Sequence, residues 1–345
     1  MKVAYMYDDT VGLHSYGKGH PMNPIRISMT HSLVKSFKID REMDLYIPSR
    51  VKLTYHNKEY LNSIGTRDAT DDCPTFEGIN DYVERYCSAT LNGAMLINSG
   101  LYKHVVNWSG GLHHAHKNEP SGFCFGNDIV MAIQELLCKH ERVMYIDIDV
   151  HHGDGVEEAF YDNDRVLTLS LHKHGENFFP NTGDLVTSTK RAVNVPLQTG
   201  ITDETYKYIF EPIVENSIRK FKPDVIVFQS GTDSLAEDKL GTFALSIQGH
   251  SECIRFVKKF DIPILLLGGG GYTIQNVARC WAYETAVFCG KEVDNFVPEE
   301  DTFREHYAPD FQLVPELVSR HRINFNGKRY LDNIMSFIQE RIDKF

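Results

Sequence analysis

Short apolar runs rich in β-branched side chains alternate with longer segments of helical periodicity along most of the 345-residue chain. Such short runs, bounded by turn residues, are typical of buried strands. The pattern predicts strands at 3–7, 104–108, 143–150, 166–171, 225–229 and 263–267. It predicts helices at about 24–38, 82–98, 126–140, 203–220, 247–259 and 273–289. This alternation indicates an α/β fold with a central, mostly parallel sheet flanked by helices.

No linker rich in Ser, Pro or Gly and no internal repeat divides the chain, so we expect one domain over residues 1–345. The expected core covers about residues 3–290. Residues 291–345 are more polar and end in an amphipathic segment at 331–342, which should pack on the core as a helical extension. No apolar run approaches the ~20 residues of a membrane span, so we expect no membrane association.

The composition changes this picture only slightly. Hydrophobic residues make up 42% and charged residues 24%, and the net charge is −11. An acidic chain is unsuited to direct nucleic-acid binding, which needs a basic surface, and it suits a cationic substrate or partner. The seven cysteines have no paired spacing, which favours a reducing compartment over a disulfide framework.

Candidate chemistry is most concentrated in the strand predicted at 143–150. Side chains alternate along a strand, so Asp147, Asp149 and His151 should share one face. Buried, unpaired carboxylates are costly unless a cation neutralises them. Polar residues that already face water at a strand end are the alternative explanation. Three such residues in register, followed closely by Asp154, favour a metal site.

Polar residues also follow other predicted strands, and carboxyl ends of parallel strands share one sheet edge. Asp233 could complete a zinc site of three protein ligands with one open position, or it could be a turn residue. His113 and His114 are candidates for the general base and acid, with a histidine-rich surface loop as the alternative. Asp147 and Asp154 are the carboxylates that could orient them.

Tyr272 follows the glycine run 268–271. Its hydroxyl could donate a hydrogen bond to the oxyanion of a tetrahedral intermediate. A phosphate-binding nest is the alternative interpretation of the glycines. The run matches neither known phosphate-binding pattern, because it lacks both the GxGxxG spacing and the Lys-Ser/Thr ending. We therefore favour the catalytic interpretation.

The residues together resemble the zinc-dependent histone deacetylases, class I branch, from Val3 to about Gly290. Five segments match the family's motifs almost letter for letter and in order: 108–115, 121–124, 145–160, 268–272 and 276–281. The resemblance implies the single-domain, three-layer arginase/deacetylase-like fold. It also implies hydrolysis of N6-acetyl-lysine, most often in histone tails, and therefore a chromatin regulator that represses transcription. Corepressor complex subunits are the implied partners, and the nucleus is the implied location, with the cytoplasm as a second one.

The family's functional residues map onto single positions of this sequence. The implied zinc ligands are Asp149, His151 and Asp233. The implied catalytic residues are His114 as general base and acid, His113 as electrostatic support, Asp147 and Asp154 as their buttresses, and Tyr272. The implied substrate-binding residues are Asp72 at the rim and Gly122, Phe123, Phe179 and Leu240 in the acyl-lysine tunnel, with Arg26 in an internal channel. The implied potassium ligands are Asp147, Asp149, His151, Ser170 and Leu171 at one site and Phe160, Asn163 and Val166 at a second.

Some positions depart from the family pattern. The positions that match its inositol phosphate ligands are Ser15, Asn23, Lys239 and Gln275, so one basic residue remains where phosphate binding needs several. We therefore expect weak or absent inositol phosphate binding. Asn181 replaces the usual glycine, which asparagine tolerates at positive φ. The alternative function is an amidohydrolase of the same fold that acts on acetylpolyamines or small amides.

Overall fold

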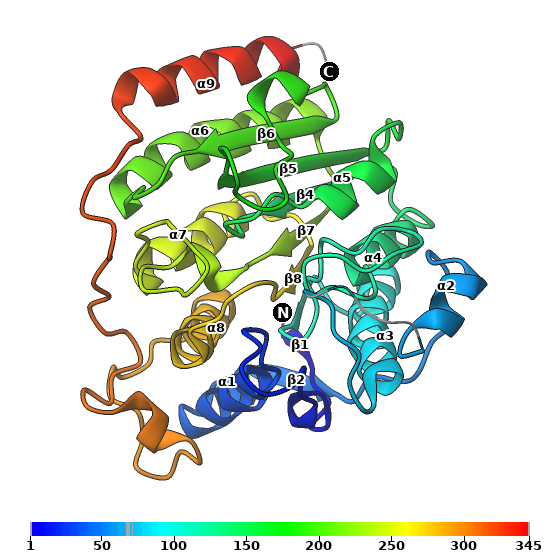
Figure 1. Ribbon diagram of the computed structural model, residues 1–345, viewed down its shortest axis with the longest axis vertical. Helices are drawn as coiled ribbons and strands as arrows, with labels where there is room; N and C mark the ends of the chain where they lie inside the picture. Colours follow the sequence, from blue (N-terminus) through cyan, green and yellow to red (C-terminus); the bar gives the residue numbers. More distant parts are fainter. Residues whose placement is uncertain (1, 67–69, 71, 344–345) are drawn as a thin grey trace.

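The computed structural model describes residues 2–66, 70 and 72–343, and its centre is one sheet of eight parallel strands (Figure 1). The strand order is β2-β1-β3-β8-β7-β4-β5-β6. The strands are β1 (Val3–Met6), β2 (Met43–Tyr46), β3 (His104–Asn107), β4 (Val143–Asp147), β5 (Val166–Lys173), β6 (Ala192–Leu197), β7 (Val225–Gln229) and β8 (Ile264–Leu267). The predicted α/β fold with a parallel sheet is confirmed.

Helices cover both faces of the sheet and give three layers (Figure 1). Neighbours along one face are in contact as the pairs α1–α8, α8–α7, α7–α6 and α6–α9. On the other side, α3 packs on α4, and α4 contacts α5. The first face carries α1 (Ile25–Ser36), α8 (Ile274–Cys289), α7 (Ile247–Lys258), α6 (Asp203–Phe221) and α9 (Lys328–Ile342). The other side carries α2 (Lys58–Ser63), α3 (Ile79–Asn98), α4 (Asp128–Leu136) and α5 (Asp154–Phe160).

Every residue of the central strands β4, β7 and β8 is buried, which explains why their sequences are almost continuously apolar. In the parallel register, Asp147 at the end of β4 lies opposite Gln229 of β7 and Ser170 of β5. Polar side chains therefore begin at the same level on three adjacent strands. This level is the edge of the sheet at which ligands bind in open α/β folds.

The two strands that the sequence pattern missed are the edge strands β2 and β6. β6 contains Pro196, which cannot donate a backbone hydrogen bond and is tolerated because β6 pairs only with β5 in the described sheet. β2 reads Met-Asp-Leu-Tyr, and its Leu45 side chain is exposed. This exposure weakens the sequence signal of β2, whereas all six residues of β6 are buried and Pro196 is what argues against a strand there.

The prediction that one strand covers residues 143–150 was wrong, because β4 ends at Asp147. The Asp147 carboxylate accepts a hydrogen bond from the backbone N–H of Asp149 at 3.0 Å, and Asp149 accepts one from that of His151 at 3.0 Å. Two successive turns of this kind, each closed by an aspartate side chain, end the strand. Asp149 and His151 are therefore placed by turns and not by strand alternation.

The C-terminal amphipathic segment forms α9, which packs on α6. Its buried residues, Leu331, Ile334, Ile338 and Ile342, recur every three or four positions, as expected of a helix that buries one face. None of the helices among the described residues has both the length and the apolar character that crossing a membrane requires.

Candidate metal centre and catalytic residues

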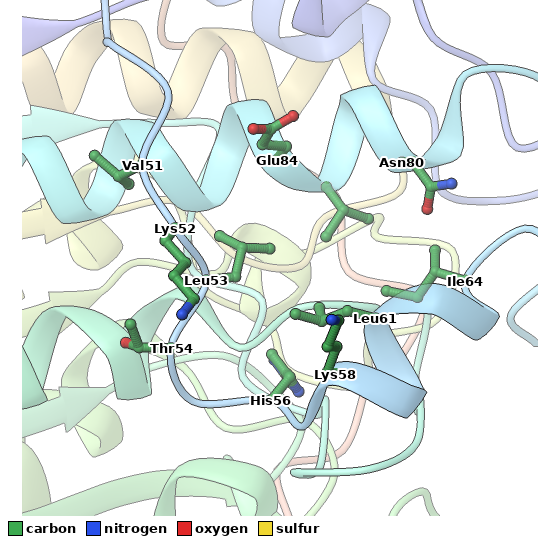
Figure 2. A pocket seen from close by; sticks show the side chains of 11 residues that line it. Val51, Lys52, Leu53, Thr54, His56, Lys58, Leu61, Ile64, Asn80 and Glu84 are labelled. Carbon is green, nitrogen blue, oxygen red and sulfur yellow. The ribbon is translucent and has the colours of Figure 1, made fainter.

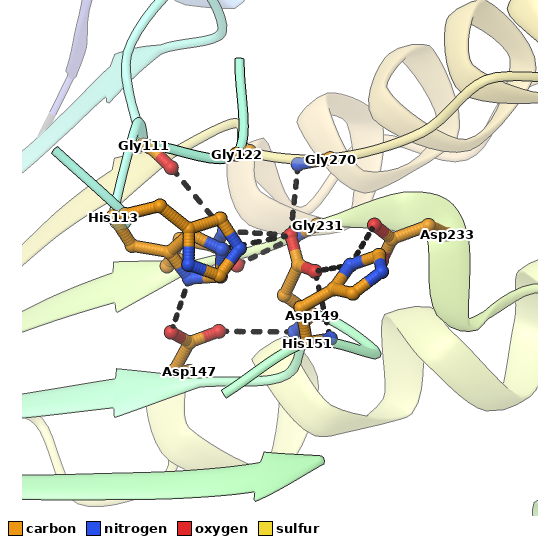
Figure 3. A network of polar contacts seen from close by, with 12 residues as sticks. Gly111, His113, Gly122, Asp147, Asp149, His151, Gly231, Asp233 and Gly270 are labelled. Atoms are coloured by element: carbon orange, nitrogen blue, oxygen red, sulfur yellow. Dashed lines mark hydrogen bonds and ion pairs between the residues drawn. The ribbon is translucent and has the colours of Figure 1, made fainter. Parts of the chain in front are cut away.

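Three buried side chains converge beyond the carboxyl ends of β4 and β7 (Figure 3). Asp149 and His151 lie in the turns after β4, and Asp233 lies in the turn after β7. Nδ1 of His151 is 3.1 Å from Oδ1 of Asp149 and 3.1 Å from Oδ2 of Asp233. Both carboxylates are fully buried, and the His151 side chain is 9% exposed. The structure thus brings together the three residues that the resemblance implies as zinc ligands.

The donor set of this cluster fits a cation. Two carboxylates face one imidazole nitrogen, and a single proton cannot satisfy both. Burial and the charge of Asp149 raise the pKa of Asp233, and contacts with both carboxylates raise the pKa of His151 although burial opposes this. In a tetrahedral zinc site with bonds of about 2.0 Å, donor atoms lie about 3.3 Å apart. The observed separations of 3.1 Å are close to that spacing.

The second oxygen of Asp149 fixes the carboxylate to the protein. Oδ2 accepts a hydrogen bond from the backbone N–H of Gly270 at 2.8 Å (Figure 3). It also accepts one from Nε2 of Gln229 at 2.9 Å. A Cβ atom at Gly270 would lie 2.1 Å from Asp233 Oδ2, and one at Gly231 would lie 2.1 Å from Asp149 Oδ2. Glycine is therefore needed where these two loops approach the carboxylates.

Two adjacent histidines after β3 face carboxylates at the same edge. Nδ1 of His113 is 2.8 Å from Oδ2 of Asp147, and Nδ1 of His114 is 2.7 Å from Oδ1 of Asp154. The two ring centroids are 3.9 Å apart. Because each Nδ1 is placed to donate its proton to a carboxylate, each Nε2 carries the free lone pair when the ring is neutral.

Their surroundings shift the pKa values of the two histidines in opposite directions. Burial disfavours the charged form of both rings. For His113 the charges of Asp147 and Asp149 outweigh burial and raise the pKa to about 9. For His114 burial and the neighbouring His113 lower the pKa to about 4 despite the contact with Asp154. Groups of one kind with separated pKa values are typical of acid–base sites.

Tyr272 follows the four glycines after β8 and is 5% exposed. Burial raises its pKa well above the usual range, so the hydroxyl stays protonated and can donate a hydrogen bond. Arg26 supports the glycine loop from α1: Nη1 donates to the carbonyl of Gly271 at 2.8 Å and Nη2 to that of Gly269 at 2.7 Å. Its guanidinium also lies over the Trp281 ring, 5.0 Å from the centroid.

A cavity of about 320 Å³ opens beside the cluster. Phe179 presents its ring to His114 edge to face at 4.8 Å, and Phe123 does the same to Tyr272 at 5.6 Å. The lining residues are Asp72, His114, Gly122, Phe123, His151, Phe178, Phe179, Leu240 and Tyr272. All five residues predicted to bind substrate are among them. Asp72 also accepts a hydrogen bond from the backbone N–H of Gly122 at 3.1 Å.

Phe178 is a lining residue that the sequence analysis did not single out. Its ring stacks on His151 with centroids 5.2 Å apart and planes 12° apart. The signal in the sequence was the aromatic pair Phe178–Phe179, of which only the second was predicted to contact substrate. Asn181, just beyond, has φ 67°, so it adopts the positive φ expected where glycine is usual.

A larger hollow of about 610 Å³ lies elsewhere, between α3 and the segment around α2 (Figure 2). Two of its titratable groups are already engaged, because Glu84 pairs with Arg50 at 3.2 Å and His56 bonds the carbonyl of Lys117 at 3.0 Å. The lining residues are Val51, Lys52, Leu53, Thr54, His56, Lys58, Leu61, Ile64, Asn80, Val83 and Glu84. This hollow therefore lacks the convergent chemistry of the smaller cavity.

A second buried cluster, His250, Cys280 and Glu284, also contains potential metal ligands, and the sequence analysis missed it. Nδ1 of His250 is 2.6 Å from Oε1 of Glu284, which is a hydrogen-bond distance. The other ring nitrogen bonds the carbonyl of Gly231 at 2.9 Å, and Ser230 donates to Glu284 at 2.9 Å. These contacts make the cluster a support for the β7 turn that carries Asp233.

The implied potassium ligands lie in two places. Ser170 and Leu171 are in β5, where Ser170 pairs with Asp147, so they adjoin the candidate metal centre. The second group lies around the turn between α5 and β5, where the backbone N–H of Asn163 donates to the carbonyl of Phe160 at 2.9 Å and that of Val166 to Asn163 at 3.1 Å. Their binding of potassium stays a prediction.

Three metal donors with paired histidines at the carboxyl edge of a parallel sheet are the arrangement of a metal-dependent hydrolase. Residues 20–288 match the histone deacetylase domain, so the chain belongs to the histone deacetylase family. It is 46% identical to histone deacetylase B of Dictyostelium discoideum, over 99% of this chain and 86% of that protein. It is also 46% identical to histone deacetylase 1 of Homo sapiens, over 99% of this chain and 75% of that protein. These similarities are consistent with the class I branch.

Proposed function

We propose that this protein is a zinc-dependent lysine deacetylase that hydrolyses N6-acetyl-lysine, most often in histone tails, to acetate and lysine. One observation carries the proposal: three metal donors and two His–Asp pairs lie at one aromatic-walled cavity in a chain of the histone deacetylase family. In the cell the protein would then regulate chromatin and repress transcription.

Zinc is the metal we assign to Asp149, His151 and Asp233, because three protein ligands with one open position are typical of catalytic zinc. When bound, zinc would polarise the acyl carbonyl and lower the pKa of a water molecule. Potassium is assigned to two sites, one at Asp147, Asp149, His151, Ser170 and Leu171 and one at Phe160, Asn163 and Val166. Both potassium assignments come from the family resemblance.

The proton transfers are assigned to the histidines. Nε2 of His114 takes the proton of the attacking water, since the low pKa of this ring keeps it neutral at physiological pH. His113, held by Asp147, supplies positive charge beside the developing oxyanion. The Tyr272 hydroxyl donates a hydrogen bond to that oxyanion. Protonated His114, oriented by Asp154, then gives its proton to the lysine nitrogen as the amide bond breaks.

The cavity is assigned to the acyl-lysine side chain. Phe123 and Phe179 give apolar walls that suit a neutral aliphatic stem better than a charged one. Gly122 and Leu240 complete the tunnel. Asp72 at the rim is assigned to the substrate backbone, and Arg26 is assigned to an internal channel under the glycine loop.

Partners, location and domain limits are further parts of the proposal. Subunits of corepressor complexes are the expected partners, and the nucleus the main location, with the cytoplasm second. Inositol phosphate binding should be weak or absent, because Lys239 is the one basic residue among the corresponding positions, Ser15, Asn23, Lys239 and Gln275. We treat residues 1–345 as one catalytic domain whose segment 291–345 is a C-terminal extension.

The test is an acetate-release assay of purified, zinc-replete protein on acetyl-lysine peptides and, in parallel, on acetylpolyamines. We expect turnover of the peptides, loss of turnover after chelation and recovery on adding zinc. A preference for acetylpolyamines would replace the substrate assignment with the alternative. No turnover of either substrate class by zinc-loaded protein would refute the hydrolase assignment.

A further inference from the structure

Asp238 is a buried carboxylate between the two loops that carry Leu240 and Tyr272, and it is 3% exposed. Oδ1 accepts hydrogen bonds from the backbone N–H groups of Leu240 at 2.9 Å and Gly241 at 3.1 Å. Oδ2 accepts hydrogen bonds from those of Tyr272 at 2.7 Å and Thr273 at 3.2 Å. One side chain therefore joins the tunnel rim to the residue proposed to stabilise the oxyanion.

Among the described residues, the four hydrogen-bond partners of the Asp238 side chain are all backbone N–H groups. An ionised carboxylate offers about four acceptor positions, so these bonds use its full capacity. An amide at this position would keep one accepting oxygen and turn an NH₂ group toward two donors. Either the rim loop or the tyrosine loop would then lose its attachment.

The C-terminal extension holds this loop from outside. The Glu237 side chain accepts a hydrogen bond from the backbone N–H of Val318 at 2.9 Å. Nη2 of Arg320 donates to the carbonyl of Gly241 at 2.9 Å and also to the carbonyl of Asp238. Residues 318–320 therefore contact the loop whose inner side contacts Tyr272.

We propose that Asp238 is a positioning residue that fixes Tyr272 relative to the tunnel rim, with Arg320 supporting it from the C-terminal extension. The inference rests on the proposed deacetylase function. The Tyr272 backbone cannot shift without breaking its hydrogen bond to Asp238. The Tyr272 ring contacts the Phe123 ring, and this apolar contact offers no hydrogen bond that could fix the hydroxyl. The hydroxyl position thus depends on this backbone attachment.

A double-mutant cycle between Asp238→Asn and Tyr272→Phe tests the proposal. With Tyr272 present, Asp238→Asn should lower kcat by about 10-fold to 100-fold, because small misplacements of a catalytic group have effects of this size. With Phe at position 272, the same substitution should lower kcat by less than about threefold, since no hydroxyl remains to be misplaced. Zinc affinity, measured by chelator competition, should be unchanged.

Asp301→Asn is the matched control. Asp301 is also buried and accepts hydrogen bonds from Ser32 and Ser36 at 2.9 Å and from the backbone N–H of Phe303 at 2.9 Å, away from the cavity. The Asp301→Asn substitution should lower the melting temperature of the protein without lowering kcat. If Asp238→Asn does not fold, Arg320→Met enters the same cycle and should lower kcat by a smaller factor, again only when Tyr272 is present.

An equal loss of kcat in both backgrounds would overturn the proposal, and so would weakened zinc binding, because both indicate general damage to the fold. The absence of any kcat change in Asp238→Asn would overturn it as well. Failure of the proposed function looks different: the unsubstituted, zinc-loaded protein would not hydrolyse acetyl-lysine peptides at all.

Discussion

Two acidic clusters of this protein differ in how the negative charge of their carboxylates is balanced. At the start of α3, Asp81 pairs with Arg50 and with Arg85, and Arg85 also pairs with Asp8 at 2.6 Å. At the carboxyl edge of the sheet, Asp149 and Asp233 instead converge on the single imidazole of His151. In the first cluster, arginine side chains balance the charge of the carboxylates. In the second, the two carboxylates share one imidazole, which cannot balance both charges.

The pKa shifts record this difference. Hydrogen bonds from Arg85 and Arg50 lower the pKa of Asp81, whereas burial and the charge of Asp149 raise the pKa of Asp233. A surface cluster of this kind contributes little to stability because water screens it. A buried cluster with unbalanced charge is retained at a cost, which marks it as a functional site. Charge balance therefore separates the two clusters better than the number of acidic residues does.

Asp233→Ala removes one carboxylate of the buried cluster. Without this donor the site should lose zinc, and acetyl-lysine turnover should fall by more than about a thousandfold because both carbonyl polarisation and water activation are lost. Metal content of the purified variant and its turnover are the measurements. A variant that keeps one zinc per chain and full turnover would show that Asp233 is not a ligand.

Tyr272→Phe removes the phenol hydroxyl beside the buried acidic cluster and leaves the carboxylates of that cluster unchanged. We expect zinc to be retained and kcat to fall by about 100-fold to 1000-fold, as for loss of one oxyanion donor. Steady-state kinetics and metal analysis check both parts. Unaltered kcat would remove Tyr272 from the chemistry, and loss of zinc would assign it a structural role.

The pH dependence of zinc affinity is the next test. Raised pKa values mean that His151 and Asp233 hold protons in the metal-free site that zinc must displace. Affinity should therefore weaken as pH falls, by at least about tenfold between pH 8 and pH 6. Chelator competition at the two pH values measures this. An affinity independent of pH would contradict the proton competition that the buried cluster implies.

Asp81→Asn probes the balanced cluster and should have the smallest effect. Its ion pairs are partly exposed, so the free energy of unfolding should fall by no more than about 1 kcal/mol. Turnover should not change. Urea unfolding and the acetate assay are the measurements. A large loss of turnover would mean that the surface cluster communicates with the site.

The sequence predicted the central strands well because they are buried on both faces and read as apolar runs. It missed β2, which is partly exposed at the edge of the sheet, and β6, which is buried but contains Pro196. It also extended β4 past Asp147, because side-chain alternation cannot reveal turns closed by aspartate carboxylates. The correct grouping of Asp149 with His151 survived this error.

The site residues in distinctive segments could be predicted, together with the carboxylates Asp147 and Asp154 that contact the histidines. Supporting residues outside those segments could not. His113, His114 and Tyr272 stand in distinctive segments after strand ends, which drew attention to them. Asp238 and His250 act through backbone groups of other loops, so only the folded structure places them. These two residues therefore gave no signal in the sequence, unlike Asp147 and Asp154, which stand in the distinctive segment 145–160.

The successive aspartate turns after β4 have a consequence for folding. Asp149 and His151 are brought together within five residues of Asp147, whereas Asp233 comes from a turn 82 residues beyond His151. A nascent chain can therefore bring two of the three candidate metal ligands together locally. The third joins them when β7 pairs with β4. A metal ion bound by these three residues would cross-link the neighbouring strands β4 and β7, so its release should precede their separation during unfolding.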